Sequence, residues 1–462
     1  MKNPYLNIDQ KIVGDIYTSS EVMDNLSILC DDFGSRFGGT EGERLAAEFI
    51  MDKFKQYGLK NVHFEPIEYL GWIRGDARLE IIEPIHKEIP CISLPQSPAV
   101  EMEGKIVDLG DGHPDDFEKR AAEIKGNIVM VSSEIHPKGI TRWVHRGEKF
   151  DRSLLAGASG FIFVNHYPGY GPATGGVGVK EKGAPIPGIS INKENGAYIQ
   201  RLAKRRGQVK IRISSTDKLT PMESWNVIGD LPGKDHPEEI VLMGCHYDGH
   251  DISQGAGDPA SGVTAVMEAA RVLSKYTPEL HRTIRFAMWG VEEIGLFGSK
   301  AYVKKHLDEL KNLRFYLNLD AAGSVDPKDI NLHAWPELQD TFENYRDEMS
   351  LDFKIGQKFH SFSDHYPFLL KGVVTGGIES VRESRTGRGY GHTYYDTVDK
   401  VTTTGMRDAA AMASRIALRV ANEEKWPVSH RGKDEIGQLL SKPPHSEAQD
   451  YQEKLDKFLE KR

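Results

Sequence analysis

Histidines and acidic residues recur along this chain at spacings that suit metal binding. An imidazole and a carboxylate stand two residues apart at His246 and Asp248, and a second carboxylate, Asp258, follows ten residues later. Residues two apart in extended chain point to the same side, so the first pair shares one face. Four more candidates lie further along the chain: Glu292, Glu293, Asp320 and His392. Such side chains can hold a divalent metal ion and carry out acid–base chemistry.

Each of these pieces also has an ordinary structural explanation. A His-x-Asp pair is usually a surface feature, adjacent acids often begin a helix, and a single Asp after a strand is often a helix N-cap. Taken together they favour a functional site, because three successive predicted strands end in an acid or a histidine. The carboxyl ends of parallel strands are where such sheets gather their ligands.

The composition of the set indicates the metal and its number. Two His, two Asp and one Glu form a nitrogen and oxygen ligand set that suits zinc better than calcium or magnesium, and cobalt or manganese can also occupy it. Three ligand carboxylates against two dications leave one positive charge, which a hydroxide would cancel. We therefore predict two Zn²⁺ per chain, with Co²⁺ or Mn²⁺ as substitutes. Glu293 is predicted as a ligand and Glu292 as the general base, since adjacent residues in a turn point in different directions.

The elements that must position these residues follow from hydrophobic patterning. From Asn226 onward, strand-like and helix-like runs alternate, which is typical of a parallel sheet with helices on its faces. The predicted strands are 239–245, 283–289, 315–319 and 373–378, and the predicted helices are 262–274, 296–306, 336–349 and 405–422. Nearer the N-terminus, helical spacing predicts a helix over 19–57 that ends at Gly58.

The pattern changes between about residues 98 and 215. Short β runs at 105–109, 127–131 and 160–164 alternate there with a glycine-rich loop at 169–176. We therefore predict three parts. They are a discontinuous catalytic domain (1–97 and 216–428), an inserted domain (98–215) and a polar C-terminal tail (429–462). The tail can cap a domain, meet a partner or be mobile.

Composition sets the class of protein. The chain has 462 residues, of which 39% are hydrophobic and 27% are charged, which is typical of a compact globular protein. A net charge of -9 excludes a basic field for nucleic acid. Three scattered cysteines suggest reduced thiols, and the chain has neither a signal-like apolar core nor a membrane-spanning run. We expect a soluble, cytoplasmic protein that binds no membrane.

The ordered set of candidate residues resembles the co-catalytic di-zinc aminopeptidase family, in particular the branch that includes plasma glutamate carboxypeptidase. The order and spacing of all five ligand positions agree with that family. Similar stretches occur at 34–39, 72–75 and 254–258, and the likeness covers most of residues 20–425. The resemblance implies a mixed, mainly parallel, doubly wound α/β sheet with helices on both faces. It also implies that the insert is a protease-associated α/β domain that roofs the cleft and limits substrate size.

The resemblance also assigns roles within the set. Asp258 would bridge the two zinc ions, His246 and Asp320 would complete one site, and Glu293 and His392 would complete the other. Glu292 would be the catalytic general base. Asp248, also assigned to the catalytic group, would accept the second ring N–H of His246 and fix its tautomer.

Substrate-binding candidates lie near His392 and in a family-like stretch at 363–368. Of Tyr390, Tyr394 and Tyr395, any one can donate a hydrogen bond to the oxyanion, or all can pack with their hydroxyls at the surface. Arg382, with Arg385 and Arg388, can clamp a substrate carboxylate or lie in a solvated loop. Asp364 can border the cleft or, as we favour, cap a helix.

These observations predict a di-zinc metallo-exopeptidase that hydrolyses the peptide bond next to a free amino terminus in short peptides or dipeptides. Three further functions remain open: carboxypeptidase-like specificity, glutaminyl cyclase-like activity with one zinc ion, and a catalytically silent binding module. Members of the family often dimerise, so the expected partners are short peptides and a second copy of the chain.

Overall fold

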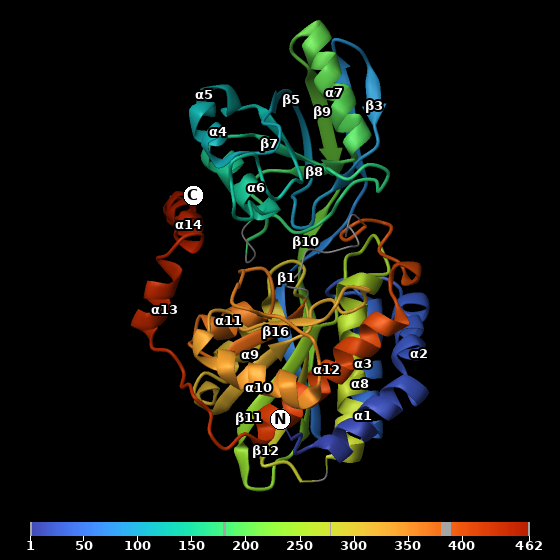
Figure 1. Ribbon diagram of the computed structural model, residues 1–462. Coiled ribbons are helices and arrows are strands. Elements are labelled where there is room, and N and C mark those ends of the chain that lie inside the picture. The colour runs from blue at the N-terminus through green and yellow to red at the C-terminus, as the bar shows by residue number, and fades with distance from the viewer. Residues whose placement is uncertain (1, 179–181, 278, 380–389, 461–462) are drawn as a thin grey trace. The chain divides into compact units, whose positions relative to one another are not determined.

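The computed structural model describes residues 2–178, 182–277, 279–379 and 390–460 (Figure 1). By its internal contacts the chain divides into two compact units. The first unit comprises Met1–Ile67, Glu223–Arg388 and Asp396–Gly437. The second comprises Glu68–Met222, Gly389–Tyr395 and Gln438–Arg462.

The first unit is built on an eight-stranded sheet in the order β1-β10-β12-β11-β13-β16-β14-β15. Its central strands run parallel: β12 (Arg282–Trp289), β11 (His236–His246), β13 (Leu313–Asn318) and β16 (Thr375–Glu379). The flanking strands are β1 (Lys60–Ile73), β10 (Lys218–Leu231), β14 (Asp329–Asn331) and β15 (Ile355–Gly356). β10 and β14 are antiparallel to their central neighbours. The predicted mixed, mainly parallel sheet is confirmed.

Helices cover both faces of this sheet (Figure 1). Alternate residues of β11 show the two faces, because Val241 packs in one apolar cluster and Leu242 in another. The first cluster includes residues of α1 (Leu6–Ser19), α3 (Glu41–Gln56), α8 (Ser261–Tyr276), α10 (Gln339–Met349) and α12 (Thr403–Asn422). The second includes residues of α9 (Phe297–Lys305) and α11 (His365–Leu369). In the described part of the chain, no helix has the length and apolar character needed to cross a bilayer.

The helix predicted over 19–57 is wrong as one element. It is divided into α2 (Val22–Ser27), a π-turn (Ile28–Asp32) and α3, with irregular chain over 33–40. Gly34 and Gly39 adopt positive φ angles of 66° and 77°, which glycine reaches at little cost and which a helix does not allow. Thr40 then begins α3 by accepting a hydrogen bond from the amide of Glu43. Apolar periodicity continued through the break because both helices bury the same kind of face.

The second unit has its own eight-stranded sheet in the order β3-β2-β9-β5-β6-β7-β8-β4. Its parallel centre consists of β5 (Val100–Asp108), β6 (Ile128–Ser132), β7 (Gly160–Val164) and β8 (Gly188–Ile191). The antiparallel strands are β2 (Ala77–Glu83), β3 (Lys87–Ile89), β4 (Ile92–Ser93) and β9 (Lys210–Ser215). Its helices include α4 (Pro114–Lys119), α5 (Ala121–Ile124), α6 (Arg146–Leu155) and α7 (Lys193–Arg206). Residues 68–97, which we predicted in the catalytic domain, group with this unit.

The C-terminal tail also groups with the second unit from Gln438 onward. After α13 (Lys433–Leu440), helix α14 (His445–Leu459) packs on α6 and buries Leu455 to 4% exposure. Arg142 Nε donates to Glu447 at 2.8 Å, and the Arg152 guanidinium lies 5.0 Å from the Tyr451 ring centre. The last helix of the tail therefore packs on the inserted domain, and the role of the tail stays a prediction.

Candidate metal centre

A first group of ligand atoms converges at the carboxyl edge of the first unit's parallel strands. His246 ends β11, Asp320 follows β13, and Asp258 lies in the turn Ala256–Ala260. The Nε2 atom of His246 lies 3.3 Å from Asp258 Oδ1 and 3.3 Å from Asp320 Oδ1. Ligands about 2.1 Å from a tetrahedral zinc ion are roughly 3.3 Å apart. The three side chains therefore fit the shell of one zinc ion.

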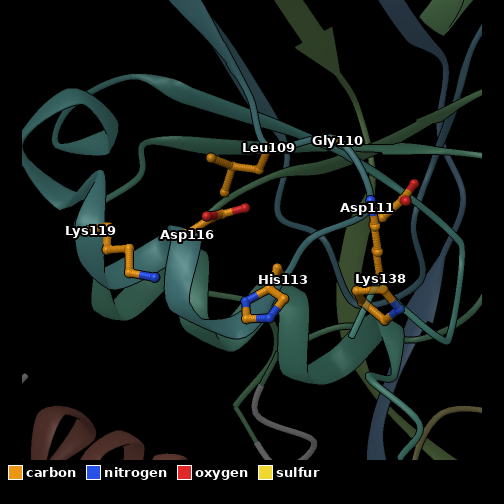
Figure 2. Close-up of a pocket in the computed structure, with 8 residues that line it drawn as sticks. Leu109, Gly110, Asp111, His113, Asp116, Lys119 and Lys138 are labelled. Atoms are coloured by element: carbon orange, nitrogen blue, oxygen red, sulfur yellow. The ribbon is translucent and has the colours of Figure 1, made fainter. Parts of the chain in front are cut away.

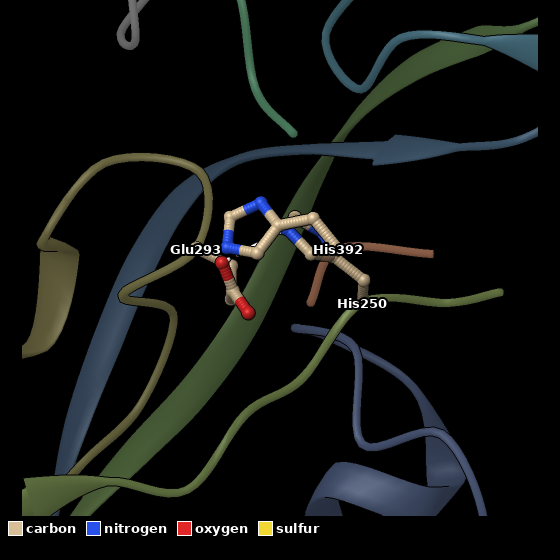
Figure 3. Close-up of side chains that lie close together, drawn as sticks. All are labelled: His250, Glu293 and His392. Atoms are coloured by element: carbon tan, nitrogen blue, oxygen red, sulfur yellow. Dashed lines mark ion pairs between the residues drawn. The ribbon is translucent and has the colours of Figure 1, made fainter. Parts of the chain in front are cut away.

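A second group begins with Glu293, just after β12, and His250, in the loop after β11. The Nε2 atom of His250 lies 2.9 Å from Glu293 Oε2, and both side chains are almost fully buried. Both residues belong to the first unit (Figure 3). His392 belongs to the segment 389–395, which groups with the second unit, so its part in a shared centre is a proposal.

Sequence reasoning missed His250. A signal was present, because His246, Asp248 and His250 follow one another at intervals of two residues. The same argument that placed the first two on one face extends to the third. The family resemblance, in contrast, implies no ligand at position 250.

The carboxylate of Asp248 lies beside His246 and also holds the turn after β12. It lies 3.6 Å from Nδ1 of His246, too far for a hydrogen bond, and that nitrogen is instead 3.0 Å from the main-chain oxygen of Asp248. The carboxylate accepts the amides of Glu292 and Glu293 at 2.8 and 3.2 Å. The predicted role of Asp248 beside the imidazole stays a prediction. What the structure adds is that the Asp248 carboxylate holds the main chain of Glu292 and Glu293.

The turn that carries Glu292 is held by its own main chain. Val291 has a positive φ of 56°, which a β-branched residue rarely adopts. The amides of Gly295 and Leu296 donate to the carbonyl of Glu292 at 2.8 and 2.9 Å, and Phe297 donates to that of Val291. These hydrogen bonds, together with those to Asp248, hold Val291 in its strained backbone conformation. They thereby fix the position of the Glu292 backbone and of its Cα–Cβ bond.

Asp396, which sequence reasoning also missed, holds the turn of Asp258. Its carboxylate accepts the amides of Gly257 and Asp258 at 2.7 and 3.1 Å, and Asp396 is 2% exposed. The arrangement repeats that of Asp248, because in both cases a buried carboxylate binds the amides of the residue that does the chemistry and of its neighbour. A sequence pattern cannot show this, since Asp396 lies far along the chain from Asp258.

Arg36, in the family-like stretch 34–39, ties the N-terminal segment to the loop after β11. It is fully buried, and its guanidinium donates hydrogen bonds only to main-chain carbonyls among the described residues. The acceptors are those of Leu29, Gly34, Tyr247, Gln254 and Gly255. The glycines and arginine of this stretch thus fix the loop between His246 and Asp258.

A relay of buried hydrogen bonds ends on Asp320. The indole of Trp289 donates to the hydroxyl of Tyr316 at 2.7 Å, and that hydroxyl donates to Asn318 Oδ1 at 2.8 Å. The amide of Asn318 donates to Ser363 Oγ at 2.8 Å, which donates to Asp320 Oδ2 at 2.6 Å. The indole N–H can only donate, so it sets the direction of every later hydrogen bond in the relay. Ser363 therefore donates to Oδ2 of Asp320, and Oδ1 of Asp320 faces His246.

The electrostatics of the site show an excess of negative charge. Burial raises the pKa of Glu292 well above its usual range, His246 opposes this, and Glu293 and Asp364 add to it. Burial opposes protonation of His246, yet Glu292 and neighbouring carboxylates raise the pKa of its imidazole well above its usual range. Carboxylates brought this close call for a cation. The donor set and its charge therefore fit divalent metal ions.

The substrate-binding candidates fall in three places. Asp364 precedes α11 and is buried, but its side chain makes no capping hydrogen bond to the helix, and burial raises the pKa of its carboxyl to about 7. The predicted helix cap is therefore wrong. Tyr390, Tyr394 and Tyr395 lie on the segment that groups with the second unit, and the last two are each 47% exposed. Arg382, Arg385 and Arg388 lie outside the described residues.

Comparison with protein families gives two matches. Residues 226–417 match the model of peptidase family M28, and residues 98–199 match the PA domain. These matches agree with the predicted family over residues 226–417 and with the predicted inserted protease-associated domain over residues 98–199.

Among curated proteins, human carboxypeptidase Q is 28% identical over 302 residues, which cover 64% of this chain and 64% of that protein. The match to it and to other carboxypeptidase Q chains thus spans less than two thirds of their length. A probable leucine aminopeptidase 2 from Aspergillus oryzae is 26% identical over 385 residues, covering 79% of this chain and 72% of that protein.

Solved structures share the fold. A peptidase M28 precursor from Shewanella amazonensis has a TM-score of 0.79 at 24% identity, covering 92% of this chain and 99% of that chain. BSAP, a zinc aminopeptidase from Bacillus subtilis, has a TM-score of 0.67 at 23% identity, covering 89% and 97%. At these identities the likeness concerns the fold alone.

Proposed function

Because the chain carries a peptidase family M28 domain at residues 226–417, we propose that it is a di-zinc metallo-exopeptidase. It would cleave the peptide bond next to the free amino terminus of short peptides or dipeptides. The observation that carries the proposal is the convergence of His246, Asp258 and Asp320 beside the general base Glu292. The carboxylates of this region supply the negative charge that a hydrolytic metal centre needs.

The proposed ligands are His246 and Asp320 for one ion, Glu293 and His392 for the other, and Asp258 between them. Zinc, when bound, supplies Lewis acidity toward the scissile carbonyl and lowers the pKa of water. Glu292 takes the proton of the attacking water at its carboxylate and gives it to the leaving amine. Burial raises the pKa of the Glu292 carboxyl well above its usual range, which makes it a better proton acceptor than an exposed glutamate.

The remaining residues of the site act by position. Asp248 keeps Glu292 and Glu293 on one fixed turn, Asp396 keeps Asp258 in place, and Ser363 holds one oxygen of Asp320. A base held by main-chain hydrogen bonds loses little freedom when the substrate binds. One tyrosine of Tyr390, Tyr394 and Tyr395 is our proposed donor to the oxyanion.

The choice of terminus rests on the relatives. The relative named probable leucine aminopeptidase 2 from Aspergillus oryzae supports cleavage at the amino end, whereas the relatives named carboxypeptidase Q favour the second candidate, cleavage at the carboxyl end. A panel of dipeptides blocked separately at each terminus, assayed with added zinc, decides between them. Loss of cleavage only on N-acetylation supports the aminopeptidase, and loss only on C-amidation overturns it in favour of the carboxypeptidase.

The same panel separates a peptidase from a binding module and from a cyclase. A protein with full zinc content that hydrolyses none of the peptides is a binding module, which contradicts the proposal. One zinc ion per chain together with cyclisation of an N-terminal glutamine indicates a glutaminyl cyclase-like enzyme. Zinc per chain is measured by elemental analysis of the purified protein.

Location and assembly are part of the proposal. We propose a cytoplasmic protein that forms a homodimer and binds neither nucleic acid nor membrane, supported by the three free cysteines and the net charge of -9. Cell fractionation and light scattering of the purified chain test these points.

A further inference from the structure

His250 is buried next to Glu293 without being one of the five ligands that the resemblance implies. It is 2% exposed, it lies on the loop after β11, and its Nε2 atom faces Glu293 Oε2 at 2.9 Å (Figure 3). Both residues belong to the first unit. A buried imidazole in contact with a proposed metal ligand has either to bind the metal itself or to orient that ligand.

The distribution of ligand atoms favours binding. In the described structure Asp258 groups with His246 and Asp320, which gives one ion three protein ligands. Without His250, the other ion would have Glu293, His392 and only a share of Asp258. With His250, that ion would also have three protein ligands of its own, His250, Glu293 and the proposed His392, the usual number for a catalytic zinc ion with an open position.

The distance fits this role with a small adjustment. Two ligand atoms on one tetrahedral zinc ion lie roughly 3.3 Å apart, so the 2.9 Å between His250 and Glu293 has to widen by about 0.4 Å. Side-chain rotation supplies such a change. We propose that His250 is a protein ligand of the second metal ion, an inference that rests on the proposed di-zinc function.

The proposal makes the two metal sites chemically unequal. The first group has one imidazole and two carboxylates, whereas the second has two imidazoles and one carboxylate. Imidazole favours zinc, cobalt and copper, while carboxylates accept manganese and magnesium as well. We therefore expect Mn²⁺ to compete with zinc at the first site and to compete poorly at the second.

The decisive measurement is zinc affinity. Metal-free protein is titrated with zinc against a chromophoric chelator, for the wild type, His250→Ala and His250→Gln. His281→Ala, which changes a histidine 41% exposed in the same unit, is the matched control. We expect two zinc ions in the wild type and in the control. In His250→Ala one ion should bind as before and the other at least about 100-fold more weakly, since even the loss of an outer partner costs 10–100-fold.

The glutamine variant separates a ligand from an orienting residue. Glutamine can donate a hydrogen bond to Glu293 but is a poor zinc ligand, so His250→Gln should behave like His250→Ala. If His250→Gln keeps wild-type affinity for both ions, His250 only positions Glu293 and the proposal is overturned. Unchanged affinity in His250→Ala overturns it as well.

If the variants do not fold, a measurement on the wild-type protein still tests the proposal. X-ray absorption at the zinc edge counts imidazoles, and three histidines on two ions give an average of 1.5 per zinc, against 1 if His250 does not bind. An average near 1 overturns the inference while the proposed function stands. A wild type that binds no zinc contradicts the proposed function itself, so the two failures are distinguishable.

Discussion

Both units have a sheet edge where parallel strands end, but the side chains at the two edges differ. Each has a sheet with a parallel centre, and each therefore has an edge where the carboxyl ends of parallel strands meet. In the first unit this edge carries His246, Glu292 and Asp320. In the second unit the chain that follows β5 borders a cavity of about 490 Å³ (Figure 2). The residues lining that cavity are Leu109, Gly110, Asp111, His113, Asp116, Lys119, Pro137 and Lys138.

The difference lies in how charge is balanced. Near the second edge, the ammonium group of Lys149 is buried and donates to the main-chain oxygens of Asp111, Ser132 and Glu134. Lys119 pairs with Asp115 at 2.9 Å. At the first edge, carboxylates gather around one imidazole, and the pKa of Glu292 is raised by burial. The edge where parallel strands end offers room for a functional site. A functional site arises where the negative charge of the side chains at that edge is not balanced by nearby cations.

The largest expected effect comes from Glu292, the proposed base at the first edge. Glu292→Gln should lower kcat by about 10²–10⁴-fold, because the amide cannot take a proton from water. Zinc content should stay unchanged, since Glu292 belongs to neither ligand group. Asp116→Asn, at the second edge, is the control and should leave kcat unchanged. Near-normal turnover of Glu292→Gln on a dipeptide would show that another group is the base.

Substitution of a proposed metal ligand should lower the zinc content of the protein, and any loss of turnover should follow from that loss of zinc. Asp320→Ala leaves His246 and Asp258 as the remainder of the first group, so one zinc ion should be lost on dialysis. Ser363→Ala removes only the donor to Oδ2 and should weaken zinc about 10–100-fold. Elemental analysis and chelator competition measure both. Asp111→Ala at the second edge should change neither, and equal zinc content in Asp320→Ala would exclude Asp320 as a ligand.

The buried lysine of the second unit should give that unit a rising stability at high pH. Burial lowers the pKa of Lys149 to about 8, against about 10.4 in the unfolded chain. Between these values the unfolded state binds more protons, so the free energy of unfolding increases with pH. Comparison with Lys149→Met should show a gain of the order of 1–3 kcal/mol in the wild type between pH 8 and about 10.4. The free energy of unfolding is measured by chemical denaturation at each pH. The same dependence on pH in the wild type and in Lys149→Met would contradict this prediction.

The first edge should show the opposite slope, with an amplitude of the same order. Burial raises the pKa of Asp364 to about 7, against about 3.9 when unfolded. Between these values the folded state binds more protons, so metal-free protein should lose stability as pH rises, by an amount of the order of 1–4 kcal/mol. Thermal unfolding of metal-free wild type and Asp364→Asn tests this, because asparagine cannot ionise. A variant that keeps the wild-type slope would mean that another group titrates.

Much of the fold was predictable from local patterns. The alternation after Asn226 predicted the parallel strands, because strands buried on both faces form apolar runs of characteristic length. The break at 33–40 was not predictable from apolar spacing. It depends on the glycine turns and on the contacts of Arg36 with carbonyls of the distant loop after β11, those of Tyr247 and Gln254.

The sequence by itself determined which residues could do chemistry. His246, Asp258, Glu292, Glu293 and Asp320 stand out because strand ends concentrate functional groups whatever the details of packing. Only the tertiary structure decided their supports: Asp248 under the turn of Glu292, Asp396 under Asp258, Ser363 on Asp320, and His250 beside Glu293. The physical reason is that a hydrogen bond requires proximity and direction between groups far apart along the chain, and these exist only once the chain has folded.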